Sequence, residues 1–163
     1  MKEKNIAVVP GSFDPITNGH INIVRRAAKA YDKVYLAVMI NPTKEYMFTI
    51  SQRERIAKVA VADIDNVEVI SSEGMLWELA KELEASAIVK GYRNSEDLAY
   101  EKEMAEYNSA HYPQAETVLL TADDTLSNMS STLVRQMIRN KVSLNDVLPP
   151  RAISEINKII NES

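Results

Sequence analysis

Short apolar runs, rich in β-branched residues, alternate along this chain with longer runs whose apolar residues recur at helical spacing. The apolar runs cover residues 6–9, 34–40, 67–70, 87–89 and 118–120. Runs of this length and composition between turn residues are typical of buried strands. Five such strands separated by helices predict an α/β fold, with a doubly wound, five-stranded parallel sheet covered by helices on both faces.

The amphipathic runs predict a helix after each strand and a last one at the C-terminal end. They cover residues 19–30, 51–62, 75–85, 95–110, 131–140 and a run after Pro150. Ser51 and Glu54 have the spacing of a capping box, so we expect the second helix to begin there. Asn94 is the expected cap of the fourth helix. Because parallel sheets of this kind bind ligands at the carboxyl ends of their strands, we expect functional residues in the loops after the strands.

The composition excludes several classes of function. The chain has 163 residues, 45% of them hydrophobic, and shows no linker or repeat, so we expect a single domain over residues 1–163. The formal net charge of -4 argues against a nucleic-acid partner. The lack of cysteine excludes disulfides, thiolate metal sites and a thiol nucleophile. No apolar run approaches ~18 residues, so we expect no membrane partner and a cytoplasmic location.

Residues 10–20, PGSFDPITNGH, concentrate residues that shape the backbone. They contain two of the four glycines and two of the six prolines of the chain, together with His20. Gly11 permits a close backbone approach or a positive φ, and Pro15 stiffens the turn. Gly19 and His20 fall near a helix start, where N–H groups and the helix dipole favour an anion. This loop is therefore a candidate phosphate site, and the alternative is a plain strand–helix connection with a surface histidine.

A second polar motif, SNMSSTLVR at residues 127–135, follows the fifth predicted strand and opens a helix. Ser130, Ser131 and Thr132 offer hydroxyl groups beside the free N–H groups of a helix start, and Arg135 adds a positive charge one turn later. Taken alone, such a serine run is usually only an N-cap. Beside the first motif, it is the expected second half of a phosphate site.

The two motifs together resemble those of the nucleotidyltransferase superfamily that carries a T/H-x-G-H sequence. The first matches the pattern G-[ST]-F-D-P-x-x-x-G-H, with Thr17 to His20 as TNGH, and the second is similar to I-S-S-[ST]-x-[VI]-[RK]. The segments NPTKEYMFTISQRERI and VKGYRNSEDLAYE extend the resemblance, over nearly the whole chain, to the phosphopantetheine adenylyltransferase family. The resemblance implies a Rossmann-like nucleotidyltransferase fold with C-terminal helices.

The resemblance also implies an activity and partners. The family transfers the adenylyl group of ATP, with Mg²⁺, to 4′-phosphopantetheine and gives dephospho-coenzyme A and pyrophosphate. A homohexamer and inhibition by coenzyme A are implied in the same way. At neutral pH a phosphomonoester is already an anionic nucleophile, with a second pKa near ~6. The reaction therefore needs positioning and positive charge more than a general base.

Matching motif to motif, the resemblance assigns roles to particular residues and implies no metal site made of protein groups. The implied catalytic residues are His20, Lys44 and Arg93. The implied ATP site comprises Ser12, Phe13, His20, Gly91, Tyr92, Arg93, Glu101, Leu126, Ser127, Asn128, Met129, Ser130, Ser131 and Thr132. The implied phosphopantetheine site comprises Ser12, Lys44, Leu76 and Lys90.

This chain departs from the family pattern at four positions. Lys90 stands where arginine is usual, so the acceptor phosphate meets a point charge instead of a two-pronged fork. Leu126 replaces an aromatic residue and Asn128 replaces phenylalanine, both at the adenine pocket. Ala99 replaces an acidic residue.

Several conspicuous residues are interpreted as structural. We expect His111 to be solvated or to cap a helix end, and Trp77 and the methionines to pack mostly in the core. The pair Asp123 and Asp124 is interpreted as a solvated turn, because phosphate oxygens can supply most of a Mg²⁺ shell. The acidic run 101–106 is interpreted as a solvated helix face, apart from Glu101.

Two alternative functions remain open. One is an enzyme of the same superfamily with another acceptor, such as nicotinamide mononucleotide, or a cytidylyltransferase. The other is a nucleotide-binding module without turnover, for which Lys90 and Leu126 are the suggestive residues. Trials with different acceptors and replacement of His20 separate these alternatives.

Overall fold

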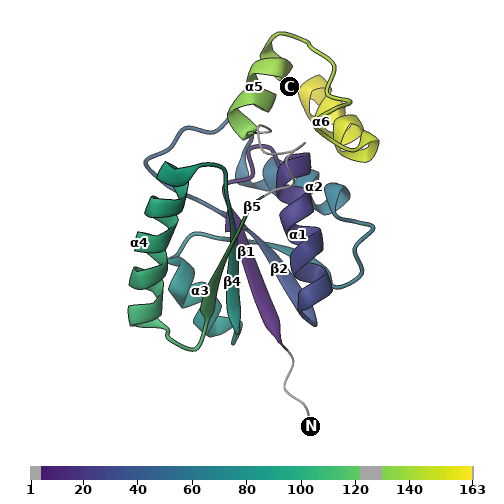
Figure 1. Ribbon diagram of the computed structural model, residues 1–163. Coiled ribbons are helices and arrows are strands. Elements are labelled where there is room, and N and C mark those ends of the chain that lie inside the picture. The colour runs from purple at the N-terminus through teal and green to yellow at the C-terminus, as the bar shows by residue number, and fades with distance from the viewer. Residues whose placement is uncertain (1–4, 122–129, 163) are drawn as a thin grey trace.

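The computed structural model describes residues 5–121 and 130–162, and it contains one five-stranded parallel sheet. The strands lie in the order β3-β2-β1-β4-β5 (Figure 1). Their bounds are β1 (Ile6–Gly11), β2 (Lys33–Met39), β3 (Val67–Ser72), β4 (Ala87–Tyr92) and β5 (Glu116–Thr121). The predicted doubly wound parallel sheet is confirmed. Strand order reverses between β1 and β4, so a ligand crevice is expected at the carboxyl ends of these two strands.

Helices cover both faces of the sheet (Figure 1). Their bounds are α1 (Asn18–Ala30), α2 (Ile50–Ala60), α3 (Leu76–Glu82), α4 (Ser95–His111), α5 (Ser131–Arg139) and α6 (Pro150–Glu162). Successive side chains of β1 alternate between the two layers, as the strand period requires. Ala7 and Val9 belong to the core cluster shared with α1, α2 and α6, whereas Val8 belongs to the smaller cluster under α3. The apolar runs are thus buried on both sides, which explains why they lack polar alternation.

The start of α2 corrects one expectation. The capping box is formed by Thr49 and Gln52: the Gln52 N–H donates to Thr49 Oγ1 at 3.1 Å, and the Thr49 N–H donates to Gln52 Oε1 at 3.0 Å. The prediction of Ser51 and Glu54 was wrong, since Ser51 already lies inside the helix and Glu54 pairs with Lys58. Residues 49–52 and 51–54 both match the capping-box motif, and the first of the two forms the cap. The predicted cap Asn94 is confirmed, because its Oδ1 accepts from the Asp97 N–H at 2.9 Å.

β4 extends three residues beyond its predicted end. Lys90, Gly91 and Tyr92 pair with Leu119, Leu120 and Thr121 of β5. The predicted strand ends with the apolar run at Val89, but the ladder to β5 continues through Lys90 and Gly91. Residues 90–92, which were expected in the loop after this strand, therefore lie on the strand end at the edge of the expected crevice.

The expectations for His111, Trp77 and the methionines are met only in part. His111 is exposed at the end of α4, with Nδ1 2.9 Å from the Tyr107 carbonyl oxygen, as expected of a solvated or capping histidine. Trp77 is half-buried and stacks on His111, with ring centroids 4.9 Å apart, so it lies outside both core clusters. Met75 is exposed. Trp77 and Met75 are thus apolar residues at α3 that do not pack in the core between the helices and the sheet.

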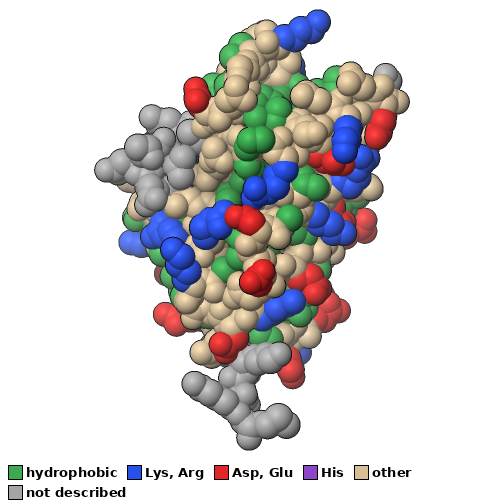
Figure 2. All heavy atoms as spheres, turned by 90° about the vertical axis from the view of Figure 1, so that its right-hand side faces the viewer, with side chains coloured by type: hydrophobic (Ala, Val, Ile, Leu, Met, Phe, Trp, Pro, Cys, Tyr) green, Lys and Arg blue, Asp and Glu red, His purple; other side chains and the backbone are tan. Residues whose placement is uncertain are grey.

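Basic and acidic side chains are interspersed on the face of the molecule turned toward the viewer in Figure 2. Arg25 and Arg151 both pair with Asp63, and Arg55 pairs with Glu155 and Glu162. None of the helices in the described ranges is long and apolar enough to cross a membrane.

Candidate active site

The first turn of α1 fixes the orientation and the proton of His20. Thr17 is the N-cap, and its backbone N–H donates to His20 Nδ1 at 3.0 Å. Burial, and to a lesser extent the positive charge of Arg93, together lower the pKa of His20 from 6.5 to about 4. The ring is therefore neutral at pH 7. Since Nδ1 accepts a hydrogen bond, the proton lies on Nε2, which makes this nitrogen a donor.

The loop between β1 and α1 packs closely on itself. A Cβ atom on Gly11 would lie 2.9 Å from the Phe13 ring, so glycine is required by close approach. The positive φ that the sequence allowed at Gly11 occurs instead at Phe13, with φ of 47°. The buried Phe13 ring meets His20 edge-on, with centroids 5.0 Å apart. Phe13 thus packs against one side of the imidazole.

Asp14 connects this loop to the two other segments of the site. Its buried carboxylate accepts from the backbone N–H groups of Met47 at 2.9 Å and Phe48 at 3.0 Å. Arg135 donates to the Asp14 carbonyl at 2.9 Å, and its Nη1 lies 3.7 Å from the carboxylate. Asp14 therefore fixes the segment that carries Lys44 and the start of α5 against the β1–α1 loop. The sequence reasoning missed it, although it lies inside the quoted motif, because an acidic residue in a turn is usually solvated.

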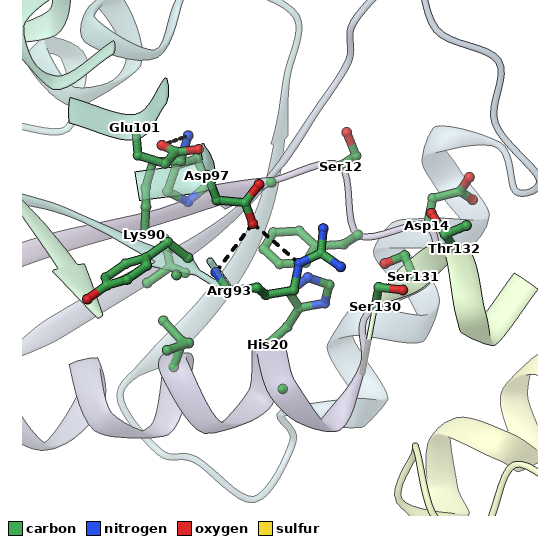
Figure 3. Close-up of a pocket in the computed structure, with 18 of the residues that line it drawn as sticks. Ser12, Asp14, His20, Lys90, Arg93, Asp97, Glu101, Ser130, Ser131 and Thr132 are labelled. Carbon is green, nitrogen blue, oxygen red and sulfur yellow. Dashed lines mark hydrogen bonds and ion pairs between the residues drawn. The ribbon is translucent and has the colours of Figure 1, made fainter. Parts of the chain in front are cut away.

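The serine motif is joined to the same loop. Ser131 Oγ donates to the Pro15 carbonyl at 2.8 Å, and Ser130 caps α5 through the Leu133 N–H at 3.1 Å. Thr132 is exposed and accepts from Arg135 at 3.0 Å. The two motifs, more than 110 positions apart in sequence, thus meet at one edge of the sheet (Figure 3).

The opposite side of the site consists of the end of β4 and the first turns of α4. Lys90 Nζ lies 2.5 Å from Glu101 Oε2, and Arg93 Nε lies 3.4 Å from Asp97 Oδ2 (Figure 3). Arg93 projects toward His20 in this view. Each cation on this side therefore already has a carboxylate partner.

These segments enclose a pocket of about 460 Å³ at the carboxyl ends of β1 and β4. Most of the residues expected in the site line it: Ser12, Phe13, His20, Lys44, Lys90, Gly91, Tyr92, Arg93, Glu101, Ser130, Ser131 and Thr132. Leu76 is not among the described lining residues, and it packs on the core cluster beneath α3. Leu126, Ser127, Asn128 and Met129, like Asp123 and Asp124, lie outside the described residues.

The structure adds Tyr46 and Asp97 to the pocket lining. The Tyr46 hydroxyl accepts from the Asn41 N–H at 2.9 Å. Desolvation raises the pKa of Tyr46, but a hydrogen bond with the Ser12 side chain, the Asn41 hydrogen bond and the charges of Arg53 and Lys44 together outweigh it, so the pKa of Tyr46 is lowered. Nothing in the sequence around Tyr46 indicates a role in the site, except that it lies in the segment NPTKEYMFTISQRERI, which resembles the family. The pocket as a whole offers donors and positive charge, the requirements of a site for phosphates.

Comparison with known proteins agrees with this chemistry. A family model described as cytidylyltransferase-like matches residues 8–137. The phosphopantetheine adenylyltransferase of Clostridium beijerinckii is 40% identical over 96% of this chain and 98% of its own length. That of Lactobacillus acidophilus is 40% identical over 94% and 96%.

Solved structures support the fold. A putative nicotinate-nucleotide adenylyltransferase from Vibrio parahaemolyticus superposes with a TM-score of 0.75, at 16% identity, over 96% of this chain and 93% of that one. A lipopolysaccharide core biosynthesis protein from Thermoplasma volcanium gives a TM-score of 0.59 at 19% identity, over 75% of this chain and 100% of that one. At these identities the likeness concerns the fold alone. The sequence comparisons go further: the chain belongs to the cytidylyltransferase-like nucleotidyltransferases and, among them, to the phosphopantetheine adenylyltransferase family.

Proposed function

We propose that this nucleotidyltransferase moves the adenylyl group of ATP to 4′-phosphopantetheine and releases dephospho-coenzyme A and pyrophosphate. The observation that carries the proposal is the neutral His20, whose Nε2–H is a fixed donor in a pocket lined by Lys44, Lys90, Arg93 and Arg135. Relatives 40% identical over nearly the whole chain bear the name of this activity.

The chemistry follows from the charges in the pocket. The acceptor phosphate attacks the α-phosphorus of ATP, the new P–O bond forms, and the bond to pyrophosphate breaks. No proton has to be removed from the acceptor, because its phosphate is ionised at neutral pH. Negative charge develops on the oxygens around the α-phosphorus. His20 donates to one of them, and Lys44 and Arg93 supply the compensating positive charge.

The binding roles divide between the two sides of the pocket. We place the acceptor phosphate beside Ser12, Lys44 and Lys90, with Leu76 bordering the pantetheine arm outside the pocket. ATP lies along the β1–α1 loop and the end of β4, against residues 91–93 and Glu101. The hydroxyls of residues 130–132 bind its phosphates, and residues 126–129 complete its site.

Mg²⁺ enters this proposal as part of the nucleotide substrate. Within the described ranges, no group of three or more His, Asp or Glu could hold a metal ion. Of the acidic residues lining the pocket, Asp14 accepts from two backbone N–H groups, and Asp97 and Glu101 form ion pairs. Glu45 is exposed and could add one carboxylate. Such a set fits Mg²⁺ whose shell comes mainly from phosphate and water, and the ion would neutralise phosphate charge there.

The homohexamer, inhibition by coenzyme A and the cytoplasmic location are also proposals. The first two rest on the resemblance to the family, and the lack of cysteine is consistent with the third. Light scattering at micromolar protein concentration tests the assembly, and a monomer would contradict it.

The deciding experiment supplies purified protein with Mg²⁺, ATP and one acceptor at a time, and measures pyrophosphate release. We expect release with 4′-phosphopantetheine and none with nicotinamide mononucleotide. Release only with the mononucleotide would preserve the mechanism and overturn the acceptor. No release with either, together with measurable ATP binding, would favour a nucleotide-binding module.

A further inference from the structure

Arg53 of α2 is a buried cation directly behind the β1–α1 loop. Its side chain is almost fully enclosed, with 2% of the residue surface exposed. The guanidinium donates to the Ser12 carbonyl at 2.9 Å, the Met39 carbonyl at 3.2 Å and the Phe48 carbonyl at 3.2 Å. The Tyr46 ring stacks on it, with the guanidinium carbon 3.8 Å from the ring centroid. Three segments around the pocket thus converge on one side chain that does not itself line the pocket.

This arrangement is an unusual way to bury a charge. Within residues 5–121 and 130–162, Arg53 forms no ion pair with a carboxylate, and its partners are neutral carbonyl oxygens and an aromatic face. Buried charges are costly and are normally paired. A planar five-donor fork can bind several carbonyls in fixed directions, which an ammonium or a neutral side chain cannot do. The geometry therefore specifies where those carbonyls point.

The Ser12 carbonyl is the one whose direction matters for the pocket. In a trans peptide, the carbonyl of one residue and the N–H of the next point in opposite directions. With the Ser12 carbonyl turned toward Arg53, the Phe13 N–H is turned away from it. Ser12 and Phe13 both line the pocket, and the Phe13 N–H donates to no acceptor among the described residues.

We propose that Arg53 is a positioning residue of the transfer reaction: by binding the Ser12 carbonyl it turns the Phe13 N–H into the pocket, where this amide donates to a phosphate oxygen. The inference rests on the proposed function, since it assumes a phosphate in this pocket. Phe13 and His20 line the same pocket, and their rings meet edge-on. Two directed donors and the positive charge behind the loop serve the same phosphates.

The test replaces Arg53 by lysine, which keeps the charge and loses the fork. We expect kcat to fall at least about tenfold, with a much smaller change in KM for ATP, because a misdirected donor weakens transition-state contacts most. The matched control is Arg55→Lys, the same replacement on the same helix, where the side chain is 40% exposed and paired with Glu155 and Glu162. It should leave kcat unchanged. Circular dichroism and thermal unfolding establish that both variants are folded.

A second measurement addresses the amide directly and remains informative if Arg53→Lys is poorly folded. Replacing the Ser12–Phe13 amide by an ester removes the N–H and leaves the side chains in place. We expect roughly a 10²-fold loss of kcat in otherwise native protein. Combined with Arg53→Lys, the two losses should be less than multiplicative, since both act through the same donor.

The outcomes are separable from the proposed function. If the unmodified protein releases no pyrophosphate with phosphopantetheine, the function fails before Arg53 is tested. If it is active, and either folded Arg53→Lys or the ester protein retains its kcat, the positioning role is wrong. Fully multiplicative losses would show that Arg53 acts by another route and would also overturn the inference.

Discussion

The side of the pocket formed by the β1–α1 loop is fixed by buried polar contacts. The side formed by β4 and α4 is joined by ion pairs, and the pair of Arg93 with Asp97 lies near the surface. The Asp14 side chain is 4% exposed and accepts from backbone N–H groups, while those of Arg93 and Asp97 are 53% and 37% exposed. Buried contacts of this kind leave little freedom, and exposed pairs rearrange at little cost. We infer that the first side is preformed for phosphate and that the second adjusts when ligands bind.

Replacing His20 by alanine is the most severe test of the preformed side. We expect turnover to fall at least roughly a hundredfold while ATP binding largely persists, because the Nε2–H acts on charge that develops in the transition state. Pyrophosphate release and calorimetric ATP binding measure the two effects. His111→Ala removes the other histidine, which is exposed at the end of α4, and should be silent. Unchanged turnover in His20→Ala would remove His20 from the mechanism.

Acid should weaken the preformed side through the same histidine. The pKa of His20 is about 4 in the folded protein and 6.5 ordinarily, so between these values the unfolded chain binds the proton and the folded one does not. Stability is therefore lost as pH falls from about 6.5 toward 4, by up to about 3 kcal/mol. His20→Gln is the reference, since glutamine at this position also completes a capping box with Thr17.

Denaturant unfolding of both proteins at a series of pH values measures this effect. The difference between them should be independent of pH above 7 and should change, to the disadvantage of the unmodified protein, below 6.5. Parallel curves down to pH 4 would contradict the lowered pKa.

Asp14→Asn tests the connection between the loops. An amide has one acceptor oxygen where the carboxylate has two, so one of the N–H groups of Met47 and Phe48 loses its partner. A buried unpaired group costs roughly 1–3 kcal/mol. Urea unfolding should show that loss, whereas Asp97→Asn on the adjustable side should change stability by no more than roughly 1 kcal/mol. Equal effects of the two substitutions would remove the contrast between the sides.

The smallest effect is expected from Lys90→Arg, at the more enclosed ion pair of the β4–α4 side. Arginine would restore a two-pronged contact with the acceptor phosphate, but it must share Glu101 as Lys90 does. We expect KM for phosphopantetheine to change by less than roughly tenfold and KM for ATP to stay constant. A collapse of kcat would instead indicate that this side is as rigid as the other.

Strand periodicity and backbone-shaping residues report on local structure, and they predicted the parallel sheet and the edge at which its ligands bind. Most of the pocket lining was predicted through the resemblance to the family. It did not predict Arg53 or Asp14. In SQRERI the arginine is indistinguishable from a solvated helix face, and only packing of α2 behind the loop makes it buried. The wrong cap at Ser51 has a similar cause, since two overlapping capping-box motifs are equivalent in sequence and only the structure shows that Thr49 is the cap.

The hydrogen bond between the Thr17 N–H and His20 Nδ1 makes one nitrogen serve both the helix and the reaction. A proton arriving on Nδ1 abolishes the acceptor that the first turn of α1 uses, and in the same event it changes the charge of the ring beside the phosphates. Protonation of this one nitrogen therefore disturbs the start of α1 and the catalytic donor together. An engineer wishing to move the working pH of such a site would have to redesign the start of a helix.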